Sequence, residues 1–176
     1  MLKISLITAV HNAIDTINDT LNSVVDQAQQ SFQLEYIVVD GASTDGTLEA
    51  LRAKNDHITT LISEPDNGIY DAINKGIAHA TGDVIGLLHA DDLFADRFLL
   101  QNIAFHFSNH PQTDGIYGDL QYVDKEQTDA IIRQWNAGEF SLKTLRNGWM
   151  PPHPTLYLRR KIYETYGPFN LDFKIA

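Results

Sequence analysis

Cysteine is absent from the 176-residue sequence, which excludes disulfide bonds, thiolate zinc sites and cysteine nucleophiles. No stretch of about 20 consecutive apolar residues occurs, so the sequence predicts no membrane-spanning helix. Nothing resembling a signal peptide precedes the first apolar run, which follows Met1 directly. Basic residues are few, and 13 Lys and Arg against 23 Asp and Glu give a formal net charge of −10. A surface of this sign repels nucleic acid, which is therefore not an expected partner.

Two common phosphate-binding loops are also missing. A dinucleotide-binding sheet needs a G-x-G-x-x-G turn after its first strand. Here the first apolar run leads into residues 11–15, His-Asn-Ala-Ile-Asp, which contain no glycine, and no Walker A sequence follows elsewhere. An acidic protein can still hold a diphosphate if a divalent metal ion stands between its carboxylates and the phosphate oxygens. The missing loops therefore favour a metal-mediated site.

Strand-like apolar runs alternate with segments of helical spacing through the first 110 residues. This alternation predicts βαβ units, and hence an α/β fold with a mostly parallel sheet flanked by helices. After Pro111 the alternation gives way to a more mixed C-terminal part. The length suggests a single domain over 1–176, with a nucleotide-binding half (1–110) and an acceptor-side part (111–176). Expected strands are 4–10, 35–39, 58–63, 84–88, 115–117, 130–135 and 155–158; expected helices are 14–28, 45–54, 69–80, 98–107, 142–145 and 161–166.

Polar side chains follow each of the first four expected strands. Ligands of open parallel sheets bind in the crevice beyond the carboxyl ends of the strands. Clustered carboxylates at such an edge suit a hard divalent cation such as Mg²⁺ or Mn²⁺. The adjacent pair Asp91 and Asp92, directly after the fourth strand, is the predicted metal site. The strand-end residues are, in chain order, Thr8, Val10, His11, Asn12, Asp40, Ser43, Glu64, Asp66, Asn67, His89, Asp91 and Asp92.

Several motifs in order resemble family 2 glycosyltransferases with the GT-A fold. They are residues 7–12 (Ile-Thr-Ala-Val-His-Asn), 38–47 (Val-Val-Asp-Gly-Ala-Ser-Thr-Asp-Gly-Thr) and 89–92 (His-Ala-Asp-Asp). Residues 63–76, followed by Ala-Thr-Gly-Asp at 80–83, are similar to a bacterial subgroup associated with surface polysaccharides such as colanic acid. The resemblance covers nearly the whole chain. It implies inverting transfer of a sugar from a nucleotide donor, UDP in the first instance, to a lipid-linked or polysaccharide acceptor.

The resemblance also implies roles for individual residues. Thr8, Val10 and Asn12 would line the nucleotide pocket, and Asp40, beside Ser43, would accept a hydrogen bond from the uracil ring. Asp71 and Lys75 would lie beside the nucleotide on one helical face. Asp91 would touch the ribose and, with Asp92, bind Mn²⁺ or Mg²⁺. His153, in a proline-rich loop, is a candidate for the acceptor side. Such an enzyme would work in the cytoplasm, at the inner face of the membrane, and a homodimer is left open.

The sequence departs from the family pattern in two places. His89 stands where the acidic motif often has Asp or Asn, and it could donate a hydrogen bond or bind metal weakly. The family's catalytic base is expected just after residues 167–176, so the base is predicted to lie beyond Ala176 and the chain to be truncated. Asp172 matches the approach to that motif and is not assigned as the base. A donor-binding domain without catalysis is therefore the alternative function.

Structural interpretations stand beside these functional ones. Asp40 could end its strand in an Asx turn. Asp71 and Lys75 are spaced i,i+4, which favours a surface ion pair. Asp91 and Asp92 could cap a helix. His153 could simply hold its loop. A sugar nucleotidyltransferase, which shares the architecture, would be expected to carry a glycine- and arginine-rich loop after the first strand, and that loop is missing.

Overall fold

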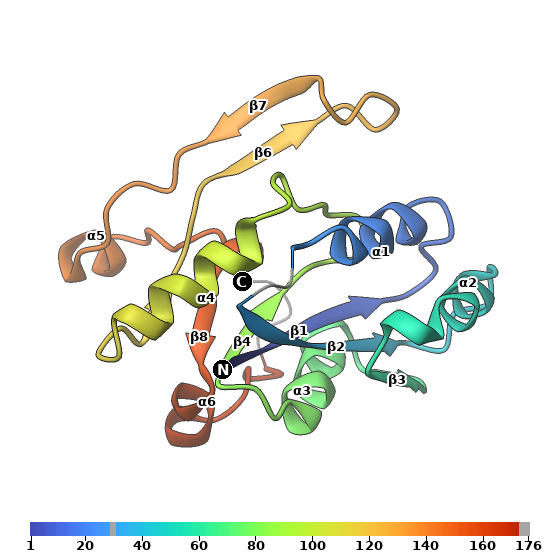
Figure 1. Cartoon of the computed structure of the whole chain (residues 1–176), viewed down its shortest axis with the longest axis horizontal. Helices are drawn as coiled ribbons and strands as arrows, with labels where there is room; N and C mark the ends of the chain where they lie inside the picture. Colours follow the sequence, from blue (N-terminus) through green and yellow to red (C-terminus); the bar gives the residue numbers. More distant parts are fainter. Residues whose placement is uncertain (29–30, 173–176) are drawn as a thin grey trace.

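A computed structural model describes residues 1–28 and 31–172 of the chain. Its centre is a six-stranded sheet in the order β3-β2-β1-β4-β8-β5 (Figure 1). The first four strands are mutually parallel, and β8 runs antiparallel between β4 and β5. The predicted α/β fold with a mostly parallel sheet is confirmed. The strands are β1 (Leu2–Val10), β2 (Phe32–Asp40), β3 (Thr60–Ser63), β4 (Val84–Leu87), β5 (Gly115–Ile116) and β8 (Tyr157–Arg159).

Helices cover both faces of this sheet because alternate residues of each strand point to opposite sides. Leu6 of β1 packs towards α1 and α2, and Ile4 packs towards α4. Ile7 points the other way, towards α3, with Tyr163 of α6 at the edge of the same cluster. The helices are α1 (Ile17–Val25), α2 (Thr47–Ala53), α3 (Ile69–His79), α4 (Leu99–Asn109) and α6 (Arg160–Tyr166).

A two-stranded hairpin stands apart from the main sheet, at the top of Figure 1. It consists of β6 (Leu120–Val123) and β7 (Ile131–Trp135), paired antiparallel, and is followed by the short helix α5 (Leu142–Arg146). The sequence analysis predicts β7 but not β6. No helix within the described ranges has both the length and the apolar character needed to cross a membrane.

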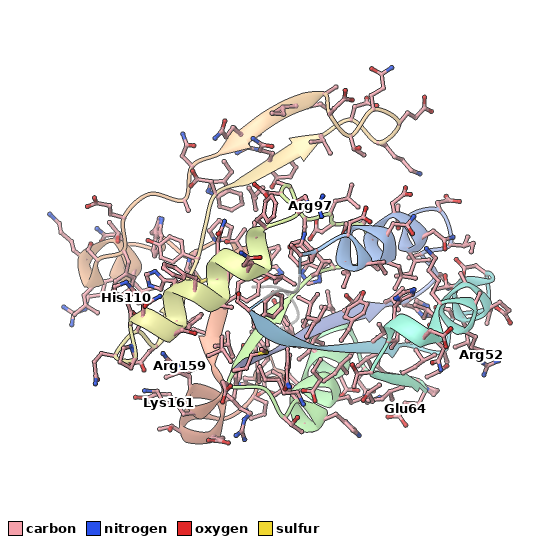
Figure 2. The ribbon with its side chains drawn as sticks, in the orientation of Figure 1. Arg52, Glu64, Arg97, His110, Arg159 and Lys161 are labelled. Atoms are coloured by element: carbon pink, nitrogen blue, oxygen red, sulfur yellow. The ribbon has the colours of Figure 1, made fainter. Side chains whose placement is uncertain are left out.

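Two expected strands begin later than their apolar patterns suggest. Residues 55–57 and 153–155 form the short 3₁₀ helices η1 (Asn55–His57) and η2 (His153–Thr155). Strand β8 therefore starts at Tyr157 rather than Thr155, whose hydroxyl donates to the carbonyls of Gly118 and Pro152. Arg159 then ties β8 to the end of α4, donating to the Phe107 and His110 carbonyls (Figure 2). These contacts fix the C-terminal part against the first 110 residues.

Glu35 in β2 is a buried carboxylate, 6% exposed, held by residues of two other segments. Lys3 Nζ lies 2.5 Å from its Oε1, Ser5 donates to Oε2, and the Thr81 backbone N–H donates to Oε2 over 2.7 Å. Burial raises the pKa of Glu35, but these hydrogen bonds outweigh it and lower the pKa from 4.5 to about 2. The ionised carboxylate therefore stabilises the junction of β1, β2 and the α3–β4 loop.

Replacing Glu35 with glutamine is expected to cost about 1–3 kcal/mol of unfolding free energy at pH 7, because buried donors lose their charged acceptor. The folded-state pKa lies below the ordinary value, so the contribution is complete above pH 4.5 and is lost as the pH falls towards 2. Denaturant unfolding at several pH values measures this difference, with the exposed Glu139→Gln variant as the control. A difference that persists undiminished at pH 2 would contradict an origin in the ionised carboxylate.

Candidate functional site

A cavity of about 640 Å³ opens beyond the carboxyl ends of β1 and β4. It lies where an open parallel sheet is expected to bind its ligand. Six separate parts of the chain form its wall, including the turn of the β6–β7 hairpin. The lining residues are Ala9, Val10, His11, Asn12, Ala13, Ile14, Asp15, Thr16, Asp45, Ile69, His89, Ala90, Asp91, Lys125 and His153.

The loop after β1 is held open by hydrogen bonds to the loop after β2. Asn12 adopts a left-handed backbone conformation with φ 50°. Its backbone N–H donates to Ser43 Oγ over 2.8 Å, and its side-chain carbonyl accepts from the Thr44 N–H over 2.9 Å. Asp45 accepts from the Ile14 N–H over 3.0 Å in the same way. Val10 and Asn12 line the cavity, and Ser43 stabilises their loop by accepting the hydrogen bond from the Asn12 N–H.

Thr8 and Asp40 lie beneath the cavity wall rather than in it. Both are fully buried. The Thr8 hydroxyl lies 3.0 Å from the Tyr36 hydroxyl. The Asp40 carboxylate accepts from the Ser43 N–H over 3.2 Å and from Ser63 Oγ over 2.7 Å. Asp40 thus holds the loop after β2 through a backbone N–H three residues on, one residue further than the contact that defines an Asx turn. These side chains hold the ends of β1, β2 and β3 in register.

On α3, the ion pair that the i,i+4 spacing predicts is present. Lys75 Nζ lies 3.7 Å from Asp71 Oδ2, 3.0 Å from Glu64 Oε1 and 2.8 Å from the Pro65 carbonyl oxygen. Asp71 also accepts from the Asn67 backbone N–H over 2.9 Å. Both side chains therefore anchor the loop after β3 to α3, and neither lines the cavity.

The acidic pair after β4 is divided between the cavity and the protein interior. Asp91 is exposed and lines the cavity. Asp92 is half-buried behind it, where burial and the neighbouring charge of Asp91 raise the pKa of Asp92 to about 6. Its backbone carbonyl accepts from the Thr20 hydroxyl of α1 over 3.0 Å. Within residues 1–28 and 31–172, no group of three or more His, Asp or Glu side chains is arranged to hold a metal ion by itself.

His153 reaches the same cavity from the C-terminal part of the chain. Its Nε2 atom lies 2.7 Å from Nε2 of His89, and the two rings meet edge to face with centroids 4.9 Å apart. Burial lowers the pKa of both imidazole rings. The negative charge of Asp91 raises the pKa of His89 and that of Asp92 raises the pKa of His153, but burial is the larger effect in each case. His89, Asp91 and His153 are therefore brought together, although 64 residues separate the two histidines.

Sequence reasoning missed several cavity residues. Asp15 and Asp45 line the cavity but lie later in their loops than Asn12 and Ser43, the residues predicted to bind the nucleotide. Lys125 lies in the β6–β7 turn, with its Nζ 3.8 Å from Asp15 Oδ2. Its position at the cavity depends on a hairpin of which only one strand was predicted. Of the segment expected to approach the catalytic base, residues 173–176 lie outside the described residues.

The chain is similar to known glycosyltransferases in both sequence and structure. An uncharacterized glycosyltransferase of Mycobacterium tuberculosis is 32% identical over 98% of this chain. A PGL/p-HBAD biosynthesis glycosyltransferase of Mycobacterium bovis is 31% identical over 97%. The chain spans 64% of the length of each of these relatives.

Two solved structures share the fold at lower sequence identity. Staphylococcus aureus TarS 1–349, in complex with UDP-GlcNAc, superposes with a TM-score of 0.80 at 22% identity, over 99% of this chain and 50% of its own. A mannosyltransferase from Pyrobaculum calidifontis, in complex with GDP-Man and Mn²⁺, gives 0.71 at 23% identity, over 96% and 48%. Residues 5–167 match the family described as glycosyl transferase family 2. With a match over most of its length, with relatives above 30% identity and with this cavity at the strand ends, the chain belongs to glycosyl transferase family 2.

Proposed function

We propose that this chain carries the donor site of a metal-dependent, inverting glycosyltransferase that uses a UDP-sugar. The observation that carries the proposal is the exposed Asp91 carboxylate in a cavity at the carboxyl ends of β1 and β4. Two structural neighbours are described with a nucleotide sugar, one of them together with Mn²⁺. The proposed acceptor is a cell-surface polysaccharide or glycolipid, reached from the cytoplasmic face of the membrane.

The residues fit Mn²⁺ or Mg²⁺ shared with the donor. Such ions are commonly held by one or two carboxylates together with phosphate oxygens, so a preformed cage of protein ligands is not required. Asp91 faces the cavity, and Asp92 stands next to it as a second carboxylate. A divalent cation bound there would offset the negative charge that develops on the departing diphosphate.

The remaining predicted nucleotide-binding residues fall into two groups: those proposed to touch the nucleotide and those proposed to hold the backbone around it. Val10 and Asn12 line the cavity and are proposed to touch the nucleotide. Thr8, Asp40 and Ser43 are proposed to act through the strand ends that they hold in register. In the same way, the Asp71–Lys75 pair is proposed to act through the loop after β3, which it anchors.

Transfer also needs an acceptor hydroxyl to lose its proton to a general base as it attacks the anomeric carbon. We assign that base to none of the described residues, 1–28 and 31–172. The donor would bind through residues of this chain, and the acceptor would approach from the side of His153. Donor binding without transfer is the expected behaviour of the 176-residue chain by itself.

Calorimetric titration with UDP tests the proposal, in parallel samples containing Mn²⁺, Mg²⁺ or EDTA. Binding is expected with a divalent cation and is expected to fall at least about tenfold in EDTA, a difference of about 1.4 kcal/mol. GDP in place of UDP serves as the nucleotide control. Equal binding in EDTA, or no binding under any condition, would contradict the proposed role of the acidic pair. Rapid donor hydrolysis would show that the base lies within the chain.

A further inference from the structure

Exposed apolar side chains are concentrated in residues 131–150, which run from β7 through α5 and are called here the β7–α5 segment. Within residues 1–28 and 31–172, seven of the sixteen exposed large apolar side chains lie in this segment. They are Ile131, Ile132, Trp135, Phe140, Leu142, Leu145 and Met150, each between 38% and 69% exposed. Apolar exposure gathered in one place commonly marks a surface that binds a protein or a membrane.

The β7–α5 segment lies at the edge of the molecule, with β7 at the top and α5 at the left of Figure 1, both on the outer side of α4. All five residues of β7 are exposed. Successive side chains of a strand point to opposite faces, so both faces of the hairpin are open. A two-stranded hairpin is marginally stable by itself, and a surface that covers it would stabilise it.

Hydrogen bonds at Ala137 and Gly138 join the base of the hairpin to the chain around α5. Ala137 is buried, and its N–H donates to Asp119 Oδ1 over 2.8 Å. Its carbonyl oxygen accepts from Trp149 Nε1 over 2.8 Å. The Tyr117 hydroxyl donates to the Gly138 carbonyl over 2.8 Å. The exposed apolar side chains on either side of Ala137 therefore project from a backbone that is held in place.

The same segment is basic, although the whole chain has a formal net charge of −10. Its charged residues are Arg133, Lys143 and Arg146 against the single acidic residue Glu139, and all four are exposed. The acidic residues of the β6–β7 turn, at the end of the hairpin beside α1, are Asp124, Glu126 and Asp129. Basic side chains among exposed apolar ones complement the negative surface of an anionic membrane. Protein interfaces, in contrast, are depleted in lysine.

We propose that the β7–α5 segment binds the surface of an anionic phospholipid bilayer. Its apolar side chains would lie at the boundary between headgroups and acyl chains, where tryptophan is favoured, and its basic side chains would contact the lipid phosphates. The inference rests on the proposed function, because it names the surface through which the enzyme would reach an acceptor held in the membrane.

Both ends of the β7–α5 segment lead to the cavity at the strand ends. The turn that precedes β7 contributes Lys125 to the cavity wall. His153, which also lines the cavity, follows soon after Met150 in the chain. A bilayer bound to this segment would therefore lie near the cavity. A glycolipid acceptor could then meet the donor sugar without leaving the membrane.

Flotation with lipid vesicles tests the proposal, without nucleotide or metal. Affinity for vesicles of phosphatidylcholine and phosphatidylglycerol is expected to exceed that for phosphatidylcholine alone by at least about tenfold. Two double variants, Ile132→Ser with Leu142→Ser and Lys143→Gln with Arg146→Gln, are each expected to lose about tenfold in affinity for the anionic vesicles. The matched controls are Tyr166→Ser on α6 and Arg52→Gln on α2, both exposed and outside the segment (Figure 2). Circular dichroism shows whether each variant is folded.

Tryptophan fluorescence gives a second measurement, because Trp135 and Trp149 are the only tryptophans of the chain. Emission of the wild-type protein is expected to shift to shorter wavelength when anionic vesicles are added. The shift is expected to disappear in Trp135→Phe, since Trp149 is half-buried and its ring already contacts those of Tyr117 and Phe140. An undiminished shift in Trp135→Phe would contradict contact through β7.

Equal affinity of the wild-type protein and both double variants for anionic vesicles would overturn the inference. Self-association of the wild-type protein through this segment, measured by light scattering and without any binding to vesicles, would overturn it in favour of a second copy of the chain. The proposed function fails in a different way, namely if UDP does not bind with Mn²⁺ while binding to anionic vesicles persists. UDP binding without vesicle binding would overturn the membrane surface alone.

Discussion

UDP affinity in the presence of Mn²⁺ is expected to fall about 100-fold or more when Asp91 is replaced with alanine, equivalent to about 2.7 kcal/mol. Asp91 is the member of the acidic pair that faces the cavity, and its carboxylate is exposed. Asp92 cannot fully replace it, because Asp92 does not line the cavity and burial, the larger cause of its raised pKa, persists in the variant. The substitution therefore removes the carboxylate best placed to hold a cation against a diphosphate.

The loss should be confined to metal-dependent binding. Because the Asp91 side chain is exposed, the thermal unfolding midpoint of Asp91→Ala is expected to stay close to that of the wild-type protein. Asp56→Asn, which removes an exposed carboxylate from η1, is the matched control and should leave UDP affinity unchanged. Wild-type affinity in Asp91→Ala, titrated by calorimetry with Mn²⁺, would remove the basis for a metal at this site.

Replacement of Tyr157 with alanine is expected to lower the unfolding free energy by about 3–5 kcal/mol, the cost of deleting a large buried aromatic side chain. Tyr157 is 2% exposed and its ring lies against Gly86 of β4. A Cβ atom added to Gly86 would lie 2.1 Å from the ring. The absence of a side chain at Gly86 of β4 therefore makes room for the Tyr157 ring of β8. Without the ring, a void would open where β8 meets β4.

Tyr157→Phe is the matched variant, because it keeps the ring and removes only the hydroxyl. That hydroxyl is buried and has no hydrogen-bond partner among residues 1–28 and 31–172. Burial alone raises the pKa of Tyr157 far above its usual value. Removing a buried hydroxyl without a partner is expected to leave stability unchanged or to raise it by about 1 kcal/mol. Urea titrations of both variants measure these effects, and an equal loss in the two would show that the hydroxyl, not the ring, stabilises the junction.

Much of the parallel sheet could be predicted because its signals are local. Each strand from β1 to β4 is a short apolar run, and each intervening helix repeats apolar residues at helical spacing. The position of Asp91 in the cavity follows from the rule that ligands bind at the carboxyl ends of such strands. The family resemblance drawn from the same strand ends is confirmed by the match over residues 5–167.

The rest depended on contacts that periodicity does not encode. The sequence places the strand-end residues at one edge of the sheet, but it does not show which of their side chains point into the interior. Thr8 and Asp40 are two that do, and both are buried. The proximity of His89 and His153 requires β8 to insert antiparallel beside β4, and no local pattern specifies that partner. Lys125 reaches the cavity through a hairpin whose first strand was not predicted.

The position of β8 has a consequence for how the protein is made. Chains are synthesised from the N-terminus, and β4 is complete about 70 residues before its neighbour β8 exists. Until then the edge of β4 carries unpaired backbone groups, which can pair with another chain. Synthesis of β8 covers this edge, and the segment made just before β8 places His153 at the cavity.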